Sequence, residues 1–161
     1  MKLIVTDLEN FDLPVSGEYK LITPDEKITQ CIGCFGCWIK TPGKCVIEDG
    51  YELMGAEWSK CDEAIIVCRC VYGMPSPFVK NVLDRSLAYV HPDFEMRGGE
   101  MHHKRRYDNV IKLSAYFYGN LNVIEKRTAQ KWVQAYLDNF DGKLEEIKFF
   151  FNSEEMEGMT L

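Results

Sequence analysis

The sequence predicts a single doubly wound α/β domain, in which a parallel β-sheet lies between layers of helices. Three observations support this. The chain has 161 residues, of which 46% are apolar, so one core is expected over residues 1–161. Predicted strands and helices alternate along it. Its most apolar run, 64–68, shows no polar alternation, which is typical of a central parallel strand buried on both faces.

The first half of the chain begins with two short apolar runs, 2–6 and 18–23, which are predicted strands. The ten residues Leu8 to Gly17 connect them. A parallel crossover normally takes about a dozen residues or more, so this connection holds at most about two helical turns. A helix is expected over 51–60, with Asp49 placed to cap it.

The segment after the central strand predicts the clearest amphipathic helix. Ser76 and Pro77 provide an N-cap and a first-position proline, and the apolar stripe continues at helical spacing to Val90. Residues 93–108 are charged, contain two glycines and show no periodicity. We therefore expect a long loop over 93–108.

The C-terminal part completes the alternation. Strands are expected at 109–117 and 144–151, on either side of a helix at 122–140. Asn122 and Glu125 have the spacing of a capping box at the start of that helix.

The composition excludes several classes of function. A net charge of −6 and a pI near 5.1 argue against nucleic-acid binding, which relies on clustered Lys and Arg. The one basic run, 102–106, is expected to be a solvated loop or an anion contact. No window approaches the roughly 18 apolar residues of a membrane span. Seven cysteines in a chain too large to need disulfides favour a reducing, cytoplasmic location.

Four of the cysteines form the most informative motif. Cys31, Cys34, Cys37 and Cys45 form two CxxC steps with a shared cysteine, followed by a fourth after seven residues. Four thiolates in a tight loop suit an iron-sulfur cluster. Zinc also uses four thiolates, usually as two separated CxxC pairs, and reactive or structural thiols give a third interpretation. The spacing leaves these three alternatives open.

Two segments carry a resemblance to known families. The stretch 68–86 resembles the flavin-contacting loop and following helix of flavodoxin-like NAD(P)H-dependent FMN reductases. The stretch 31–49 resembles the cysteine segment of iron-sulfur flavoproteins in the same superfamily. The matching residues of the first stretch are Tyr72, Gly73, Met74, Pro75, Lys80, Asp84 and Arg85. Of these, Asp84 and Arg85 are expected to form an ion pair or a contact on the helix surface rather than to act as catalytic groups.

The resemblance implies a flavodoxin-like, three-layer α/β fold, with FMN as prosthetic group and NAD(P)H as hydride donor. It implies that the loop of Tyr72, Gly73, Met74 and Pro75 holds the flavin ring, and we expect Tyr118 and Gly119 to form the other wall. In iron-sulfur members the residues matching Cys31, Cys34, Cys37 and Cys45 hold a [4Fe-4S] cluster. A homodimer or homotetramer, exchanging electrons with a nicotinamide nucleotide or a small redox acceptor, is further implied.

The chain departs from the family pattern after the first strand. Family members have a Ser-rich phosphate loop there, whereas this chain has Asp7-Leu8-Glu9-Asn10. Two carboxylates would repel a phosphate dianion. Two alternatives follow. The phosphate is held elsewhere, by 102–106 or a neighbouring subunit, or the protein is a flavin-less binding or assembly subunit. A third alternative, a thiol or zinc protein, rests on the cysteines alone.

Overall fold

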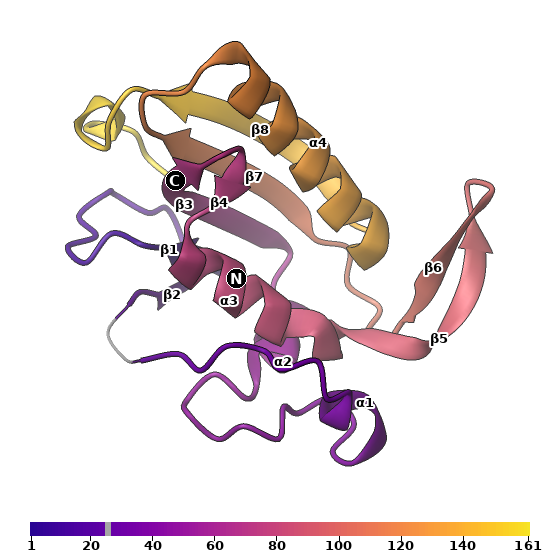
Figure 1. Ribbon diagram of the computed structural model, residues 1–161. Helices are drawn as coiled ribbons and strands as arrows, with labels where there is room; N and C mark the ends of the chain where they lie inside the picture. The colour runs from indigo at the N-terminus through magenta and orange to yellow at the C-terminus, as the bar shows by residue number, and fades with distance from the viewer. Residues whose placement is uncertain (25–26) are drawn as a thin grey trace.

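The computed structural model describes residues 1–24 and 27–161 and shows one central sheet with a separate hairpin (Figure 1). The sheet has six strands, in the order β2-β1-β3-β7-β8, with β4 antiparallel to β3. Its strands are β1 (Lys2–Thr6), β2 (Tyr19–Ile22), β3 (Glu63–Val71), β4 (Met74–Pro75), β7 (Lys112–Tyr118) and β8 (Lys143–Phe150). The five main strands are parallel. The chain order along the sheet reverses between β1 and β3, so the predicted doubly wound α/β fold is confirmed.

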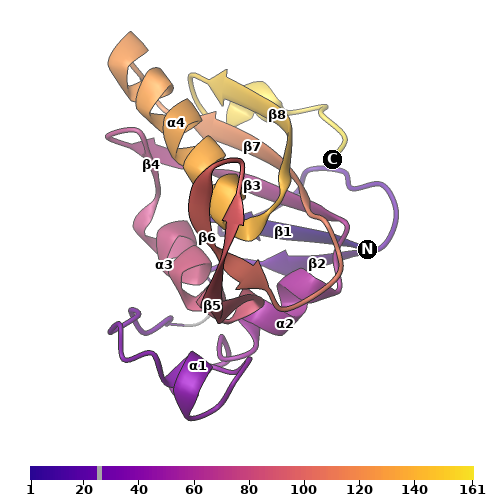
Figure 2. The same ribbon diagram turned by 90° about the vertical axis from the view of Figure 1, so that its right-hand side faces the viewer.

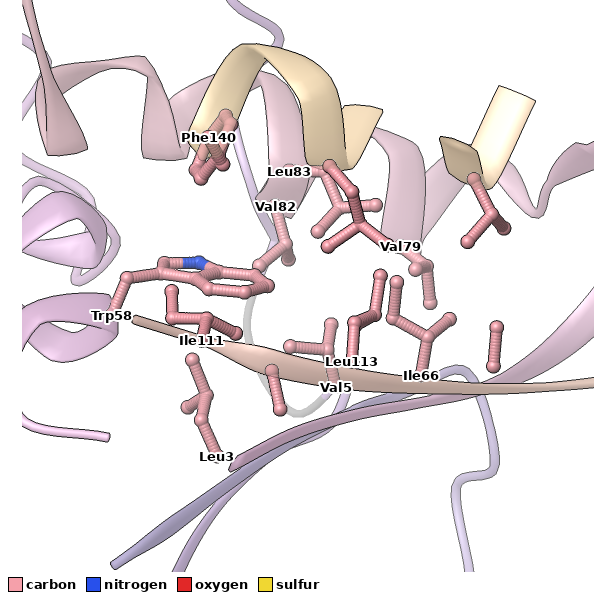
Figure 3. Close-up of a cluster of buried hydrophobic side chains, with 14 of the residues drawn as sticks. Leu3, Val5, Trp58, Ile66, Val79, Val82, Leu83, Ile111, Leu113 and Phe140 are labelled. Carbon is pink, nitrogen blue, oxygen red and sulfur yellow. The ribbon is translucent and has the colours of Figure 1, made fainter. Parts of the chain in front are cut away.

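One face of the sheet is covered by regular helices. These are α2 (Met54–Ser59), α3 (Pro77–Arg85), the 3₁₀ helix η1 (Ser86–Tyr89) and α4 (Val123–Phe140). Figure 3 shows side chains of the sheet, including Leu3 and Leu113, meeting Val79 of α3 and Trp58 of α2. Trp58 is fully enclosed, and its indole N–H donates to Ser86 Oγ at 2.8 Å. This layer contains most of the core.

The other face has a covering layer of a different kind. Ile4, Ile65 and Val67 point to this face and pack against Leu13 and the C-terminal segment 156–161. Two backbone hydrogen bonds join those segments: Ser16 N–H to the Leu161 carbonyl at 2.7 Å, and Leu161 N–H to the Pro14 carbonyl at 2.8 Å. Figure 2 shows both segments on the side of the sheet away from α3 and α4.

The three-layer architecture is thus confirmed, and one layer is built mainly from irregular chain. Its regular part within the described residues is the one-turn 3₁₀ helix η2 (Glu154–Met156). The connection between β1 and β2, residues 7–18, explains this, because it runs across the sheet without forming a helix.

The expectation of a loop over 93–108 is wrong. Strands β5 (Val90–Arg97) and β6 (Glu100–Arg105) form an antiparallel hairpin that projects from the body (Figure 1). Gly98 and Gly99 form its two-residue turn, with φ of 59° and 89°. A pair of glycines at positive φ is the residue pattern of a type I′ hairpin turn. Both strands are partly exposed and carry charged side chains, so they lack the regular alternation of apolar and polar residues that would have indicated a hairpin.

The helices agree with the sequence more closely. Asn122 Oδ1 accepts hydrogen bonds from Ile124 N–H and Glu125 N–H, while the Glu125 carboxylate accepts from Asn122 N–H. The predicted capping box is therefore confirmed. The predicted helix to Val90 ends at Arg85 and tightens into η1. Within the described residues, no helix is both long and apolar enough to cross a membrane.

Candidate functional site

The carboxyl end of β1, beside the reversal of strand order, is occupied by the carboxylate of Asp7. Arg69 N–H donates to its two oxygens at 3.0 and 3.3 Å, and the Tyr118 hydroxyl donates to Oδ1 at 3.0 Å. Asp7 therefore connects the ends of β1, β3 and β7. Burial raises the pKa of Tyr118. The adjacent Asp7 carboxylate raises this pKa further, because the negative charges of Asp7 and an ionised Tyr118 would repel each other.

This arrangement does not fit the phosphate of FMN. Doubly wound folds bind such groups at the strand ends beside the reversal, usually on backbone N–H groups at a helix N-terminus. Here residues 7–18 form no helix that could present such N–H groups. Asp7 already accepts hydrogen bonds from the Arg69 N–H and the Tyr118 hydroxyl. A phosphate dianion would meet a carboxylate in the same place.

The predicted flavin loop forms a tight turn. Tyr72 and Gly73 have φ of 53° and 83° and join β3 to β4, with Val71 paired to Met74. A Cβ added to Gly73 would lie 2.5 Å from Thr128 Cβ, so the turn packs directly on α4. The Tyr72 side chain is 85% exposed. The turn places Tyr72 in solvent and gives Gly73 a packing role.

The other predicted wall lies at the same edge of the sheet. Gly119 N–H donates to the Phe150 carbonyl at 3.1 Å, and a Cβ on Gly119 would lie 3.8 Å from the Cys70 carbonyl oxygen. Tyr118 packs with the irregular layer, whereas Gly73 contacts α4. Five cavities of 130 to 450 Å³ in the described part of the chain are lined by none of Tyr72, Gly73, Met74, Pro75, Tyr118 and Gly119.

Residues 29–49, here called the cysteine loop, are held at both ends by one buried side chain. Arg85 of α3 has no exposed side-chain surface. Its Nη1 donates to the Thr29 carbonyl at 2.8 Å and its Nη2 to the Ile47 carbonyl at 2.9 Å. The same two nitrogens donate to Asp49 Oδ2 and Oδ1, each at 2.9 Å. Arg85 therefore closes the loop on the body of the protein.

Asp49 completes the closure. It also accepts from Thr29 N–H at 2.8 Å and from Tyr51 N–H at 3.2 Å. Arg85 holds the pKa of Asp49 well below its usual range. The expectation that Asp49 caps α2 is wrong, because the N-cap of α2 is Leu53. The expected ion pair between Asp84 and Arg85 is not found. Asp84 pairs with Lys80 on the surface of α3, whereas Arg85 is buried and pairs with Asp49.

The four cysteines of the loop are free thiols with different exposure. Cys45 is buried, Cys31 and Cys37 are half-buried and Cys34 is exposed. Burial raises the pKa of Cys37, and Cys45, Cys31 and Cys34 each raise it further by electrostatic repulsion. The loop thus brings the other three cysteines within electrostatic range of Cys37.

The predicted metal site is not confirmed. Across the described residues, no group of three or more His, Cys, Asp or Glu side chains is placed to hold a metal ion. This arrangement supports neither zinc nor a four-thiolate iron-sulfur cluster, because each needs its cysteine ligands gathered around one site. The cluster stays a prediction.

A row of rings joins the cysteine loop to the hairpin. Phe35 stacks on Trp38 at 5.5 Å between ring centroids, Trp38 lies 4.7 Å from His103, and His103 lies 4.5 Å from Phe94. The Trp38 indole N–H donates to the Val90 carbonyl at 3.1 Å. The loop and the hairpin therefore form one packed unit.

The basic run 102–106 is part of this unit rather than a solvated loop. Arg105 donates to the carbonyls of Asp108 and Asn109, and Arg106 Nε donates to the Ala88 carbonyl at 2.9 Å. Figures 1 and 2 show the hairpin and the short helix α1 (Gly36–Ile39) of the cysteine loop far from the β3–β4 turn. The structure does not bring the cysteines together with the predicted flavin residues.

The sequence did not reveal the roles of Arg85, which holds the ends of the cysteine loop, and of Asp7, which connects the ends of β1, β3 and β7. Arg85 lies next to the apolar stripe of α3. The only sequence signal for its ion pair with Asp49 is that the two side chains have opposite charges. Asp7 was noted for its repulsion of phosphate, but its bonds to Arg69 and Tyr118 depend on strand pairing that no local pattern shows.

Comparison with known proteins supports the fold. No family model matches the chain, and no curated protein matches it. Among solved structures, a Trp repressor binding protein from Bacillus subtilis matches at a TM-score of 0.57 and 10% identity, covering 94% of this chain and 88% of that one. The azoreductase AzrA matches at 0.55 and 10% identity, covering 96% and 90%. At this identity the likeness shows the architecture, and the chain has the predicted flavodoxin-like α/β fold.

Proposed function

We propose that this protein is an oxidoreductase of flavodoxin-like fold whose redox centre is the cysteine loop. The observation that carries the proposal is the grouping of four free thiols, Cys31, Cys34, Cys37 and Cys45, on one loop whose two ends are held by Arg85. The likeness to an azoreductase structure agrees with redox chemistry on this fold. Fold alone does not fix function, so the sulfur groups carry the argument.

The surroundings of Cys37 do not favour a reactive nucleophile at that position. Burial and the other three cysteines raise its pKa, whereas nucleophilic cysteines have a lowered pKa. Arg85 holds the loop ends. When bound, a [4Fe-4S] cluster would supply one-electron chemistry on these thiolates; without it, two thiols supply two electrons and two protons on forming a disulfide.

The proposal includes no flavin at the end of β1. The resemblance of the sequence implied FMN and NAD(P)H, but Asp7 and its partners do not fit the phosphate there. A small redox acceptor remains the proposed partner.

Self-association as a homodimer or homotetramer is also proposed. Its support is the set of exposed apolar side chains on the cysteine loop and hairpin, which comprises Ile32, Phe35, Ile39, Phe94, Met96 and Met101. A cytoplasmic location stays a prediction from cysteine usage.

The test is a spectrum of protein purified without oxygen, with iron, acid-labile sulfide and free thiols measured before and after mild oxidation. We expect either iron and sulfide, or reversible loss of thiols within residues 29–49, in the wild type. The matched control is Cys61→Ser, because Cys61 is buried outside the loop. No iron and no reversible thiol oxidation would contradict the proposal.

The Asp7 network favours a second candidate, a flavin-less binding or assembly subunit. In that case added FMN would not bind and the loop cysteines would be redox-inert. Titration of the same sample with FMN, followed by flavin fluorescence, separates the outcomes. Tight FMN binding by the wild type would contradict both the second candidate and the flavin-free form of the first.

A further inference from the structure

Three apolar side chains at the start of α4 and on the β3–β4 turn are almost fully exposed. Tyr72 is 85% exposed, Ile124 76% and Val123 75%, more than any other large apolar side chain described outside the cysteine loop and hairpin. Val123 and Ile124 begin α4 and lie outside its buried residues, which start at Ala129. Figure 2 shows the start of α4 and the β3–β4 turn on the same side of the sheet. These three residues are here called the apolar tip.

Tight packing of the turn holds Tyr72 beside α4. Its φ of 53° is uncommon for a residue other than glycine and belongs to the turn. A Cβ on the next residue, Gly73, would lie 2.5 Å from Thr128 Cβ and 2.9 Å from the Glu125 carbonyl oxygen. Thr128 Oγ1 donates to the Ile124 carbonyl at 2.9 Å. The turn therefore rests on the first turns of α4, with its aromatic ring in solvent.

Two cations share the outer face of α4 with the tip. Arg127 and Lys131 follow Ile124 after three and seven positions, so the three side chains lie on one face of the helix. Both cations are exposed, and neither forms a hydrogen bond or an ion pair with a described residue. Lys126 differs, because its Nζ lies over the Phe149 ring, 5.7 Å from the centroid. Arg127 and Lys131 are therefore free to meet an anion.

The start of α4 is locally positive. Its first three turns carry Lys126, Arg127 and Lys131 against one carboxylate, that of Glu125. This carboxylate accepts a hydrogen bond from the Asn122 N–H at 3.0 Å, so it serves the helix cap. The whole chain has a net charge of −6, which makes this helix end different from the average surface. A partner of the tip is therefore expected to be anionic.

The shape and charge of the tip distinguish between its potential partners. None of the five cavities noted above is lined by Tyr72, Val123 or Ile124, so a small ligand has no enclosed site there. A two-fold contact between copies of the chain would gather Arg127 and Lys131 with their own counterparts, and like charges repel. A folded acidic protein would have to supply a hollow for the tip. A bilayer with anionic headgroups takes protruding apolar side chains and attracts cations without any preformed hollow.

We propose that the apolar tip docks on the surface of an anionic lipid bilayer. Val123 and Ile124 enter the boundary between headgroups and acyl chains. The Tyr72 ring lies at the level of the headgroups, where an apolar ring with a polar hydroxyl is favoured. Arg127 and Lys131 face the lipid phosphates. This contact involves none of the cysteines, so it is independent of the proposed function.

The test is flotation of the full chain with vesicles of phosphatidylcholine and phosphatidylserine in equal amounts. We expect binding about 30-fold tighter than to phosphatidylcholine alone, the equivalent of about 2 kcal/mol for two cations at an anionic surface. Raising the ionic strength from about 0.1 to about 1 M should remove this preference, because the Debye length falls from about 10 to about 3 Å. Equal binding to both kinds of vesicle, or no binding to either, would overturn the proposal.

A pair of charge variants locates the contact. Arg127→Gln with Lys131→Gln should lose the preference for phosphatidylserine, about 30-fold. The matched control is Lys112→Gln with Lys143→Gln, which removes two exposed lysines at the starts of β7 and β8, the opposite end of the sheet from the start of α4. The control should lose less than about twofold, since screening limits the reach of distant charges. Equal losses in the two double variants would assign the binding to net charge and overturn the proposal.

An apolar variant tests insertion separately from attraction. Ile124→Gln keeps the charge and should weaken vesicle binding at least about tenfold, because it removes an apolar side chain from the bilayer. Leu144→Gln, at an exposed leucine of β8, should leave binding unchanged. Unchanged binding in Ile124→Gln would show a purely electrostatic contact and overturn the proposal. Where Ile124→Gln does not fold, the charge variants decide.

Fluorescence reports whether the tip itself leaves water. The emission of Tyr72→Trp, after subtraction of the wild type with its three native tryptophans, should shift to the blue on binding to phosphatidylserine vesicles. An unshifted emission from bound protein would place another face on the bilayer and overturn the proposal. Poly-L-glutamate is the probe for an acidic protein. Tighter binding to this polymer than to the vesicles would assign the tip to such a partner instead.

Discussion

Arg85 and Asp49 form a bidentate ion pair, in which Nη1 and Nη2 each lie 2.9 Å from a carboxylate oxygen, and this pair closes the cysteine loop. The two residues are 36 positions apart and lie on different elements. The same two nitrogens also donate to the carbonyls of Thr29 and Ile47, so the start and end of the loop meet at one side chain. The cysteines therefore have a fixed frame although their loop contains little regular structure.

Replacing Arg85 by Met should destabilise the fold by about 3–5 kcal/mol. Removal of one partner of a buried pair leaves the other charge uncompensated, here at Asp49, together with two unpaired carbonyls. Urea unfolding measures the change. A double variant, Arg85→Met with Asp49→Leu, should recover part of the loss, because it removes the stranded carboxylate. A loss below about 1 kcal/mol in Arg85→Met would show that the pair does not hold the loop.

Acid should weaken the same pair. The pKa of Asp49 in the folded protein is lower than its ordinary value of 3.8, so its ionised form stabilises the fold above that value. This contribution is lost as the pH falls from about 4 toward the folded pKa. We expect the stability difference between wild type and Asp49→Asn to be constant above pH 5 and to shrink below pH 4. A difference that stays constant down to pH 2 would assign the effect of the substitution to packing.

The strands and helices were predictable because their signals are local. Buried runs such as 64–68, and the capping residues Asn122 and Glu125, carry their information within a few positions. The β5–β6 hairpin was missed because its partly exposed strands lack a clean alternation, although the Gly98-Gly99 pair was a usable signal.

The site was less predictable because it depends on distant pairs. The sequence identified the four cysteines as a group, and their mutual effect on Cys37 agrees with that. It could not show that Arg85 crosses from α3 to the loop, or that Asp7 meets Tyr118, 111 positions away. Each pair forms only once the sheet has set the strand order.

Asp7→Asn should lower the pKa of Tyr118. Asp7 raises that pKa by repelling the ionised phenolate, so a neutral amide removes the repulsion while keeping a hydrogen-bond acceptor. The control is Tyr116, whose pKa burial and Glu146 raise to about 12, and which should not change. Titration of the tyrosine ring signals by NMR measures both. An unchanged pKa of Tyr118 in Asp7→Asn would mean that Asp7 and Tyr118 do not interact in solution.

Gly73→Ala should destabilise the protein more than Gly98→Ala does. Both glycines have positive φ, 83° and 59°, so each substitution costs about 1–2 kcal/mol in backbone strain. Only at Gly73 would the new Cβ meet other atoms, 2.5 Å from Thr128 Cβ and 2.9 Å from the Glu125 carbonyl oxygen, whereas the space around Gly98 is open. Relieving that contact requires the β3–β4 turn to move from α4, at a further cost of about 1–3 kcal/mol. Urea unfolding of the two variants gives the difference directly, and equal losses would show that the turn does not rest on α4.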